Sequence, residues 1–232
     1  MNNLVAEFPN QALAYYDRAD TYRYYNQASN SLADFEKAFV LLATAPENAD
    51  QLSAYNKDKI CLDYCTAYMD DKSLYVYDNK SLEILKVGDQ LGSQNPLLLG
   101  KLSMAYYDNN NEAMAKTIGD KAKPFDTDQY NKKNIGGRFL EGFAYYQSGN
   151  YRGAATPLWG ACNNNGRPHP MINFYAAMAL WQYNSSMFDS NPNLWRDQMG
   201  IMKQWLNNVV KYGKGTKYAD LVAYAEENLS RL

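Results

Sequence analysis

The sequence of 232 residues is poor in the residue types that build metal and redox centres. It contains one histidine, His169, and three cysteines, at positions 61, 65 and 162. A structural zinc ion needs four such ligands, and nothing in the spacing of three cysteines indicates a disulfide framework. We therefore expect no metal and no cofactor, and we interpret the thiols as small buried apolar groups.

The sequence also lacks long apolar runs and an excess of positive charge. The longest apolar run, AFVLLATA at 38–45, is far shorter than the roughly 20 residues that span a bilayer. A net charge of −2 gives no electrostatic footprint for nucleic acid. The N-terminus shows no secretory signal. We expect no transmembrane segment and no nucleic-acid binding. The compartment is periplasmic or envelope-associated if an upstream signal was removed, and otherwise cytoplasmic.

Catalytic motifs are also missing. The sequence has no phosphate-binding G-x-x-x-x-G-K loop and no G-x-G-x-x-G after a strand. A Ser-His-Asp or Cys-His site would have to use His169, which lies between two prolines. A glycosidase built on two carboxylates stays open, although no pair of acidic residues stands out. We therefore predict that the protein is not an enzyme.

The periodicity that is present is helical nearly everywhere. In SLADFEKAFVLL, Leu32, Phe35, Ala38, Phe39 and Leu42 recur at spacings of three and four, which is typical of one apolar face of a helix. Segments rich in Gly, Pro, Asn and Asp divide the chain into about eleven helices. The sequence therefore predicts an all-α fold.

A template of alternating small and large residues repeats along the chain. Its five positions follow one another at offsets of three, nine, four and three. The first copy consists of Ala19, Tyr22, Ser31, Phe35 and Ala38, the second of Gly142, Tyr145, Ala154, Leu158 and Ala161, and a partial third of Ser103, Tyr106, Ala115 and Gly119.

This spacing resembles the tetratricopeptide repeat, a unit of two antiparallel helices in which small residues mark the helix crossing and large ones fill the space beside it. The resemblance implies a right-handed helical-repeat solenoid of about five antiparallel helix pairs plus a C-terminal capping helix. It divides a single domain, 1–232, into degenerate repeats at about 12–46, 51–92, 96–124, 129–168 and 170–212, with the capping helix at 216–231. We expect a lengthened loop between the two helices of the second repeat and an insertion at 182–193.

The two ends and the composition carry further expectations. The segment LVAEFPNQA at 4–12 resembles the end of a preceding repeat, which predicts that Met1 is not the natural start and that the chain is a fragment of a longer protein. The Tyr- and Asn-rich style is similar to that of envelope-associated tetratricopeptide proteins of Bacteroidetes-type bacteria.

The resemblance also selects candidate residues for a concave groove lined by the first helix of each pair. The first repeat contributes Tyr16, Asp20, Arg23 and Tyr24, and the later repeats contribute Met104, Tyr107, Phe139, Phe143 and Tyr146. Such an aromatic groove suits an extended or helical peptide. The alternative, that these side chains pack against the next repeat, stays open. The Lys/Asn/Arg set with which the family clamps a peptide carboxylate is not matched.

The sequence leaves two candidate functions, and it also contains one group of basic residues that bears on a partner. The first is a non-catalytic scaffold or adaptor that binds a peptide or protein in the concave groove. The alternative is glycan binding at the bacterial cell envelope through Tyr and Trp platforms, which require exposed, coplanar rings. A basic group at Lys121, Lys123, Lys132, Lys133 and Arg138 predicts either a positive patch for an acidic partner or a solvated loop. Neither the partner nor the oligomeric state follows from the sequence.

Overall fold

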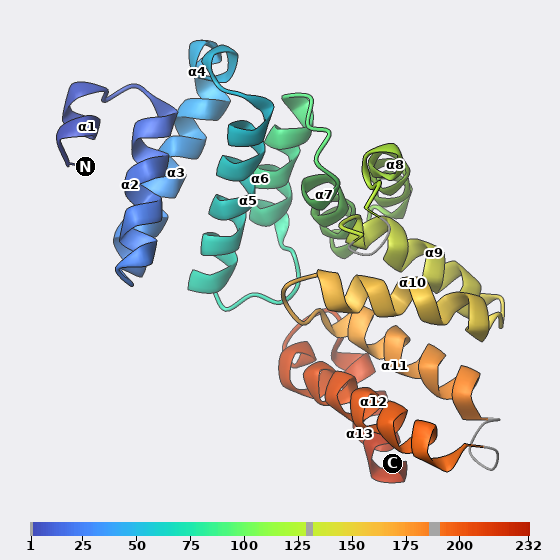
Figure 1. Cartoon of the computed structure of the whole chain (residues 1–232). Coiled ribbons are helices and arrows are strands. Elements are labelled where there is room, and N and C mark those ends of the chain that lie inside the picture. The colour runs from blue at the N-terminus through green and yellow to red at the C-terminus, as the bar shows by residue number, and fades with distance from the viewer. Residues whose placement is uncertain (1, 129–131, 186–190) are drawn as a thin grey trace.

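The computed structural model describes residues 2–128, 132–185 and 191–232. These residues form α-helices joined by turns and one short 3-10 helix, and none of them is in a strand. Five antiparallel pairs follow one another as a curved array, closed by a single helix (Figure 1). The prediction of an all-α helical-repeat solenoid with five pairs and a C-terminal helix is confirmed.

The pairs are α2 (Ala12–Tyr24) with α3 (Ala28–Thr44), α5 (Ala54–Asp71) with α6 (Asn79–Gln90), α7 (Pro96–Asp108) with α8 (Glu112–Ala122), α9 (Ile135–Gln147) with α10 (Tyr151–Asn164), and α11 (Pro170–Asn184) with α12 (Pro192–Gly213). The closing helix is α13 (Ala219–Arg231), and α1 (Asn2–Glu7) and α4 (Pro46–Gln51) are short. The predicted repeat boundaries remain a prediction. The predicted start of the fourth repeat, 129, and residues 186–190 of the predicted insertion lie outside the described residues.

Asparagine, which is plentiful in the sequence, begins several of these helices. The Asn134 side chain accepts a hydrogen bond from the Gly137 amide at 3.0 Å, and Asn150 accepts one from the Gly153 amide at 2.9 Å. Asn95 and Asn111 cap α7 and α8 in the same way. Because the first amides of a helix have no partner within it, each cap stabilises its helix by about 1 kcal/mol.

The small residues of the repeated template lie where the two helices of a pair cross. The hydroxyl of Ser31 on α3 donates to the Ala19 carbonyl on α2 at 2.9 Å. The hydroxyl of Ser103 on α7 donates to the Ala115 carbonyl on α8 at 2.7 Å. A larger side chain at either serine position would hold the two backbones apart. The small positions of the template therefore indicate where two helices pack closely.

The first helices of the third and fourth pairs, α7 and α9, approach even more closely. A Cβ atom at Gly136 would lie 2.5 Å from the Ser103 Cβ and 2.6 Å from the Gly100 carbonyl oxygen. A Cβ atom at Gly100 would lie 2.7 Å from the Ile135 amide nitrogen. Only glycine fits at these two positions, and the backbones of α7 and α9 therefore pack against each other directly.

The lengthened loop between α5 and α6, which was predicted from the sequence, reaches across the array. The ring of Tyr75 in this loop stacks on that of Tyr212 at the end of α12, with a centroid distance of 3.9 Å. Arg167, in the turn between α10 and α11, donates to the Leu74 carbonyl and pairs with Asp70. The loop thus connects the second helix pair to the last two, and Figure 1 shows it beside the turn that leads into α11.

A buried carboxylate at the end of α7 completes this connection. The Asp108 side chain accepts hydrogen bonds from the Tyr77 amide at 2.9 Å, from the Tyr218 hydroxyl at 2.5 Å and from the ring of His169, whose Nε2 lies 2.9 Å away. The Lys217 ammonium donates to the Asp108 carbonyl at 2.9 Å. Four segments that are distant in the sequence therefore meet at this one residue.

Candidate functional site: a groove between α8 and α9

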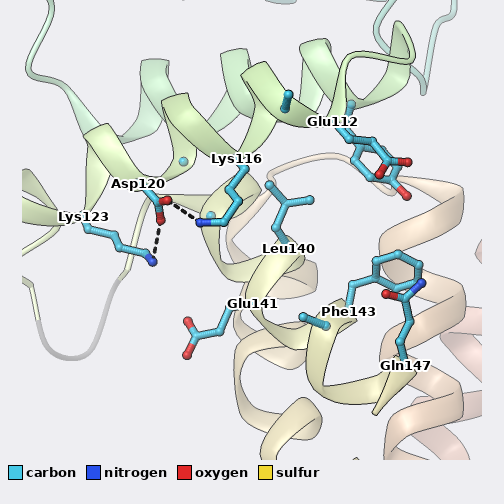
Figure 2. A pocket seen from close by; sticks show the side chains of 13 residues that line it. Glu112, Lys116, Asp120, Lys123, Leu140, Glu141, Phe143 and Gln147 are labelled. Carbon is cyan, nitrogen blue, oxygen red and sulfur yellow. Dashed lines mark hydrogen bonds and ion pairs between the residues drawn. The ribbon is translucent and has the colours of Figure 1, made fainter.

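A groove with a volume of about 610 Å³ lies between the facing sides of α8 and α9 (Figure 2). One wall consists of α8 residues spaced by three and four, the pattern of a single helix face. The other wall has the same pattern on α9. The lining residues are Tyr107, Glu112, Ala113, Lys116, Gly119, Asp120, Lys123, Gly137, Leu140, Glu141, Phe143, Ala144 and Gln147.

The groove is narrow at one end, where the two helices touch. A Cβ atom at Gly119 would lie 3.0 Å from the Gly137 Cα, so the two backbones are in contact there. Away from this point, the half-buried side chains of Leu140 and Phe143 form the apolar part of the lining. Tyr107 on α7 also contributes to this apolar part. Figure 2 shows Leu140 and Phe143 between the two helices.

The charged side chains of the groove are divided between paired and unpaired groups. Asp120 accepts a hydrogen bond from Lys116 at 2.6 Å and pairs with Lys123 at 2.7 Å, and these hydrogen bonds lower the pKa of the Asp120 carboxyl. In the part of the chain that the structure describes, no cationic side chain lies within 4 Å of the carboxylate of Glu112 or Glu141. Burial raises the pKa of the Tyr107 phenol, and the negative charge of Glu112 acts in the same direction.

Behind the groove, aromatic rings form one continuous cluster across α7, α9 and α11. Tyr107 meets Phe139 edge to face at 5.3 Å, and Phe139 stacks on Phe143 at 5.6 Å. Phe143 meets Tyr175 at 4.7 Å, and Tyr175 meets Tyr146 at 5.2 Å. Each edge-to-face or stacked pair of this kind contributes about 0.5–1.5 kcal/mol in addition to the free energy gained by burying apolar surface.

The structure separates the residues predicted for the concave groove into two groups. Tyr107, Phe139, Phe143 and Tyr146 belong to the aromatic cluster. The first-repeat residues lie on α2, where the Tyr16 hydroxyl donates to Asp63 at 2.6 Å and Arg23 pairs with both Asp20 and Asp63. Tyr24 is 81 % exposed and meets Tyr25 edge to face at 5.2 Å. Tyr107 and Phe143 line the groove between α8 and α9, whereas Arg23 lines a separate pocket of about 340 Å³.

Burial corrects part of that prediction. Met104 and Phe139 have no exposed surface, and Tyr16 is 6 % exposed. These three side chains pack against neighbouring helices, so they do not line an open surface. The glycine contacts between α7 and α9 explain why Met104 and Phe139 are buried, because these contacts bring the two helices too close to leave a groove. A partner-binding role for the accessible members stays a prediction.

Sequence reasoning missed the α8 wall of the groove entirely. It considered only the first helix of each pair, whereas Glu112, Ala113, Lys116 and Asp120 come from a second helix. The one available signal was the spacing of Lys116 and Asp120, which are four residues apart and form an ion pair on an exposed face. That spacing is common on solvated helices and indicates no groove.

Three of the five residues in the basic group predicted near the fourth repeat, Lys123, Lys132 and Arg138, line one pocket of about 400 Å³. Lys121 pairs with Asp89 at 2.6 Å, and Lys123 with Asp120 at 2.7 Å. Lys132 donates to the Asp126 carbonyl, and Arg138 donates to the Thr156 carbonyl at 3.1 Å. Lys133 lines a different pocket, which is described below.

The part of the chain that the structure describes contains no group of three or more His, Cys, Asp or Glu side chains that could hold a metal ion. His169 is 1 % exposed and lines none of the described pockets, so a substrate cannot reach its ring. Within the described ranges, no helix combines the length and the apolar character that crossing a bilayer requires.

The tryptophans pack against one another in two edge-to-face pairs. Trp159 lies 5.3 Å from Trp205, with ring planes at 83°, and Trp181 lies 6.1 Å from Trp195, with planes at 77°. Trp195 and Trp205 are buried. Crossed and buried rings do not offer the coplanar platform on which a sugar stacks.

Comparison with known proteins gives structural similarity without a family. No protein-family model matches the chain, and no curated protein matches it. Among solved structures, YrrB, described as a TPR protein with an unusual peptide-binding site, aligns over 97 % of both chains with 14 % identity and a TM-score of 0.48. The C-terminal part of a TPR repeat-containing protein from Cytophaga hutchinsonii aligns over 98 % of this chain and 78 % of its own, with 16 % identity and a TM-score of 0.44.

Proposed function

We propose that this protein is a non-catalytic scaffold that binds a peptide segment of a partner protein in the groove between α8 and α9. The observation that carries the proposal is the groove itself, with its volume of about 610 Å³ and its lining of Tyr107, Leu140 and Phe143 between two helix faces. A pocket of this size and apolar character with a few charged groups at its edge is typical of a binding site.

The groove chemistry supports a peptide ligand. Phe143 is half-buried and provides aromatic contact area that loses little conformational entropy on binding, as hot-spot residues do, and the largely buried ring of Tyr107 packs behind it. Ala113 and Ala144 are exposed and small, so a ligand can approach both helix backbones closely. The charged groups at the rim supply orientation, because exposed ion pairs contribute specificity more than affinity.

The alternative functions find less support. His169, the residue that a nucleophilic mechanism would require, is enclosed by Asp108 and Tyr218. Glycan binding would need free coplanar rings, whereas the tryptophan pairs are crossed and the exposed rings of Tyr24 and Tyr25 meet at 88°. We therefore propose neither catalysis nor glycan binding for this protein.

The test fills the groove without touching the core. In Ala144→Trp, an indole occupies the space between α8 and α9, and because Ala144 is exposed the variant should fold normally. Ala33→Trp is the matched control, since Ala33 is exposed on α3 and lines none of the described pockets. A random peptide library displayed on phage is selected on the wild type, and the selected peptides are assayed on both variants. Circular dichroism checks the fold of each.

We expect selected peptides to lose binding to Ala144→Trp and to retain it with Ala33→Trp. Retention by both variants would place the site elsewhere on the array and contradict the proposal. Failure of the selection to enrich any peptide would contradict it as well.

A further inference from the structure

A second pocket, of about 330 Å³, lies between the first helices of the second and third pairs. Three lysines from three different elements converge on it. Lys59 comes from α5, Lys101 from α7 and Lys133 from the connection between α8 and α9. We name it the lysine pocket, and its lining residues are Tyr55, Lys59, Leu62, Asp63, Thr66, Asn95, Leu97, Lys101 and Lys133.

The close approach of backbone segments places two of these lysines side by side. Gly100 immediately precedes Lys101, and a Cβ atom there would lie 3.0 Å from the Lys133 carbonyl oxygen. The backbone of Lys133 therefore rests directly on α7. The separation of the two residues along the chain hides this neighbourhood from sequence reasoning.

Among the described residues, the three ammonium groups of the lysine pocket form no direct ion pair, although that of Lys59 lies over the Tyr16 ring, 5.3 Å from its centroid. Within residues 2–128, 132–185 and 191–232, none of the three ammonium groups lies within 4 Å of a carboxylate oxygen. The acidic residue that lines the pocket, Asp63, is already held by the Tyr16 hydroxyl at 2.6 Å and by Arg23 at 3.3 Å. This local excess of cations stands out in a chain whose net charge is −2.

One of the lysines is held at an energetic cost that an anion would offset. Lys101 is half-buried, and desolvation lowers the pKa of its ammonium group. The charge of Arg167 acts in the same direction, whereas the charges of Asp63 and Asp70 act against it. A desolvated lysine that forms no direct ion pair is held at an energetic cost, because burial disfavours its charged form. A bound carboxylate would supply the missing partner.

We infer that the lysine pocket binds an acidic segment of a partner protein through side-chain carboxylates, independently of the groove between α8 and α9. The apolar contacts in the same pocket favour a peptide over a free anion. Leu62 and Leu97 line it, and Tyr55 beside them is 67 % exposed. Three ammonium groups without an arginine fork match separate carboxylates better than one compact phosphate, which is bound best by bidentate guanidinium groups.

The test uses the full chain and a fluorescent peptide that alternates Glu with Leu and Gly. The peptide is acetylated and amidated, so that only side-chain carboxylates carry charge. Fluorescence anisotropy measures its affinity for the wild type and for the triple variant Lys59→Gln/Lys101→Gln/Lys133→Gln. The matched control, Lys72→Gln/Lys80→Gln/Lys214→Gln, removes the same number of charges at exposed positions outside the pocket.

We expect the pocket variant to lose about tenfold or more in affinity, the control variant to lose little, and the wild-type affinity to fall with added salt. Equal losses in both variants would reduce the binding to non-specific attraction and overturn the inference. Tighter binding of inorganic phosphate or of a single-stranded oligonucleotide would overturn it in favour of those ligands.

The outcome is separable from that of the groove experiment. Ala144→Trp blocks the groove between α8 and α9 but leaves every residue of the lysine pocket unchanged. It should therefore bind the acidic peptide as the wild type does. Loss of acidic-peptide binding in Ala144→Trp would show that the two surfaces are not independent and would contradict the inference as stated.

Discussion

The imidazole Nε2 of His169 lies 2.9 Å from a carboxylate oxygen of Asp108, although 61 residues separate them in the sequence. Both side chains are almost fully buried, at 1 % and 0 % exposure. The same carboxylate also accepts from the Tyr218 hydroxyl and the Tyr77 amide. These contacts join the end of α7 to the loop after α5, to the turn before α11 and to the turn before α13.

Asp108→Ala should therefore destabilise the protein strongly. The substitution leaves the His169 ring, the Tyr218 hydroxyl and the Tyr77 amide buried without their acceptor, which costs about 3–5 kcal/mol. Urea unfolding followed by circular dichroism measures the change. Asp71→Ala, at an exposed position, is the control and should stay within about 0.5 kcal/mol of the wild type. A similar small change for both variants would show that the Asp108 contacts do not hold the array together.

Two glycine substitutions should have opposite effects. In Gly136→Ala the added Cβ would lie 2.5 Å from the Ser103 Cβ, so α7 and α9 must move apart at a cost of about 1–3 kcal/mol. In Gly200→Ala nothing lies within 4 Å of the added atom, and the better helix propensity of alanine should stabilise α12 by about 0.5–1 kcal/mol. Thermal unfolding of the two variants measures the signs. An unchanged or raised melting temperature for Gly136→Ala would contradict the close packing described for α7 and α9.

The natural thiols should be nearly unreactive in the folded protein. Burial raises the pKa of Cys61 and Cys65 to about 12, and that of Cys162 likewise to about 12. At about pH 8 only about one thiol in ten thousand is then ionised, and the thiolate is the reactive form. Titration with a thiol reagent should proceed slowly in the native state and reach all three cysteines quickly in denaturant. Fast reaction of the native protein would show that these sites open readily.

The same pKa values give the stability of the protein a dependence on alkaline pH. A group whose pKa is raised on folding stabilises the fold fully below its unfolded pKa, here about 8.5, and this contribution is lost as the pH rises towards 12. The free energy of unfolding should thus fall between about pH 8.5 and 12. A flat profile over this range would mean that the thiols are as exposed in the folded state as in the unfolded one.

Local spacing predicted the parts of the fold that depend on neighbouring helices. The small residues Ala19 and Ser31 were expected where two helices cross, and a hydrogen bond joins them there. The lengthened loop after α5 was also expected, but its stacking of Tyr75 on Tyr212 was not. That contact depends on the curvature accumulated over three helix pairs, which a repeat template does not encode. Tyr145 fills a template position expected in the core, yet it is 40 % exposed.

The candidate site was predicted only in part, and for a related reason. Phe143 and Tyr107, which follow the spacing of the first helices, both line the groove between α8 and α9, and their role in binding stays a prediction. Phe139 was placed beside them but is fully buried, since the glycine contacts between α7 and α9 close the space in front of it. The convergence of Lys101 with Lys133 arises from the same close approach and leaves no mark in the sequence pattern.

The central claim, that a peptide occupies the groove between α8 and α9, is tested most directly by site-specific capture. A cysteine is introduced in the groove as Ala113→Cys or, as the control, outside it as Ala33→Cys, and the natural thiols give little background because they are poorly reactive. Each variant is incubated with a peptide from the library selection that carries a thiol-reactive group, and the cross-linked product is measured by mass spectrometry. We predict efficient cross-linking to Ala113→Cys and almost none to Ala33→Cys. Equal yields from the two variants, or a higher yield from Ala33→Cys, would contradict the assignment of the groove as the binding site.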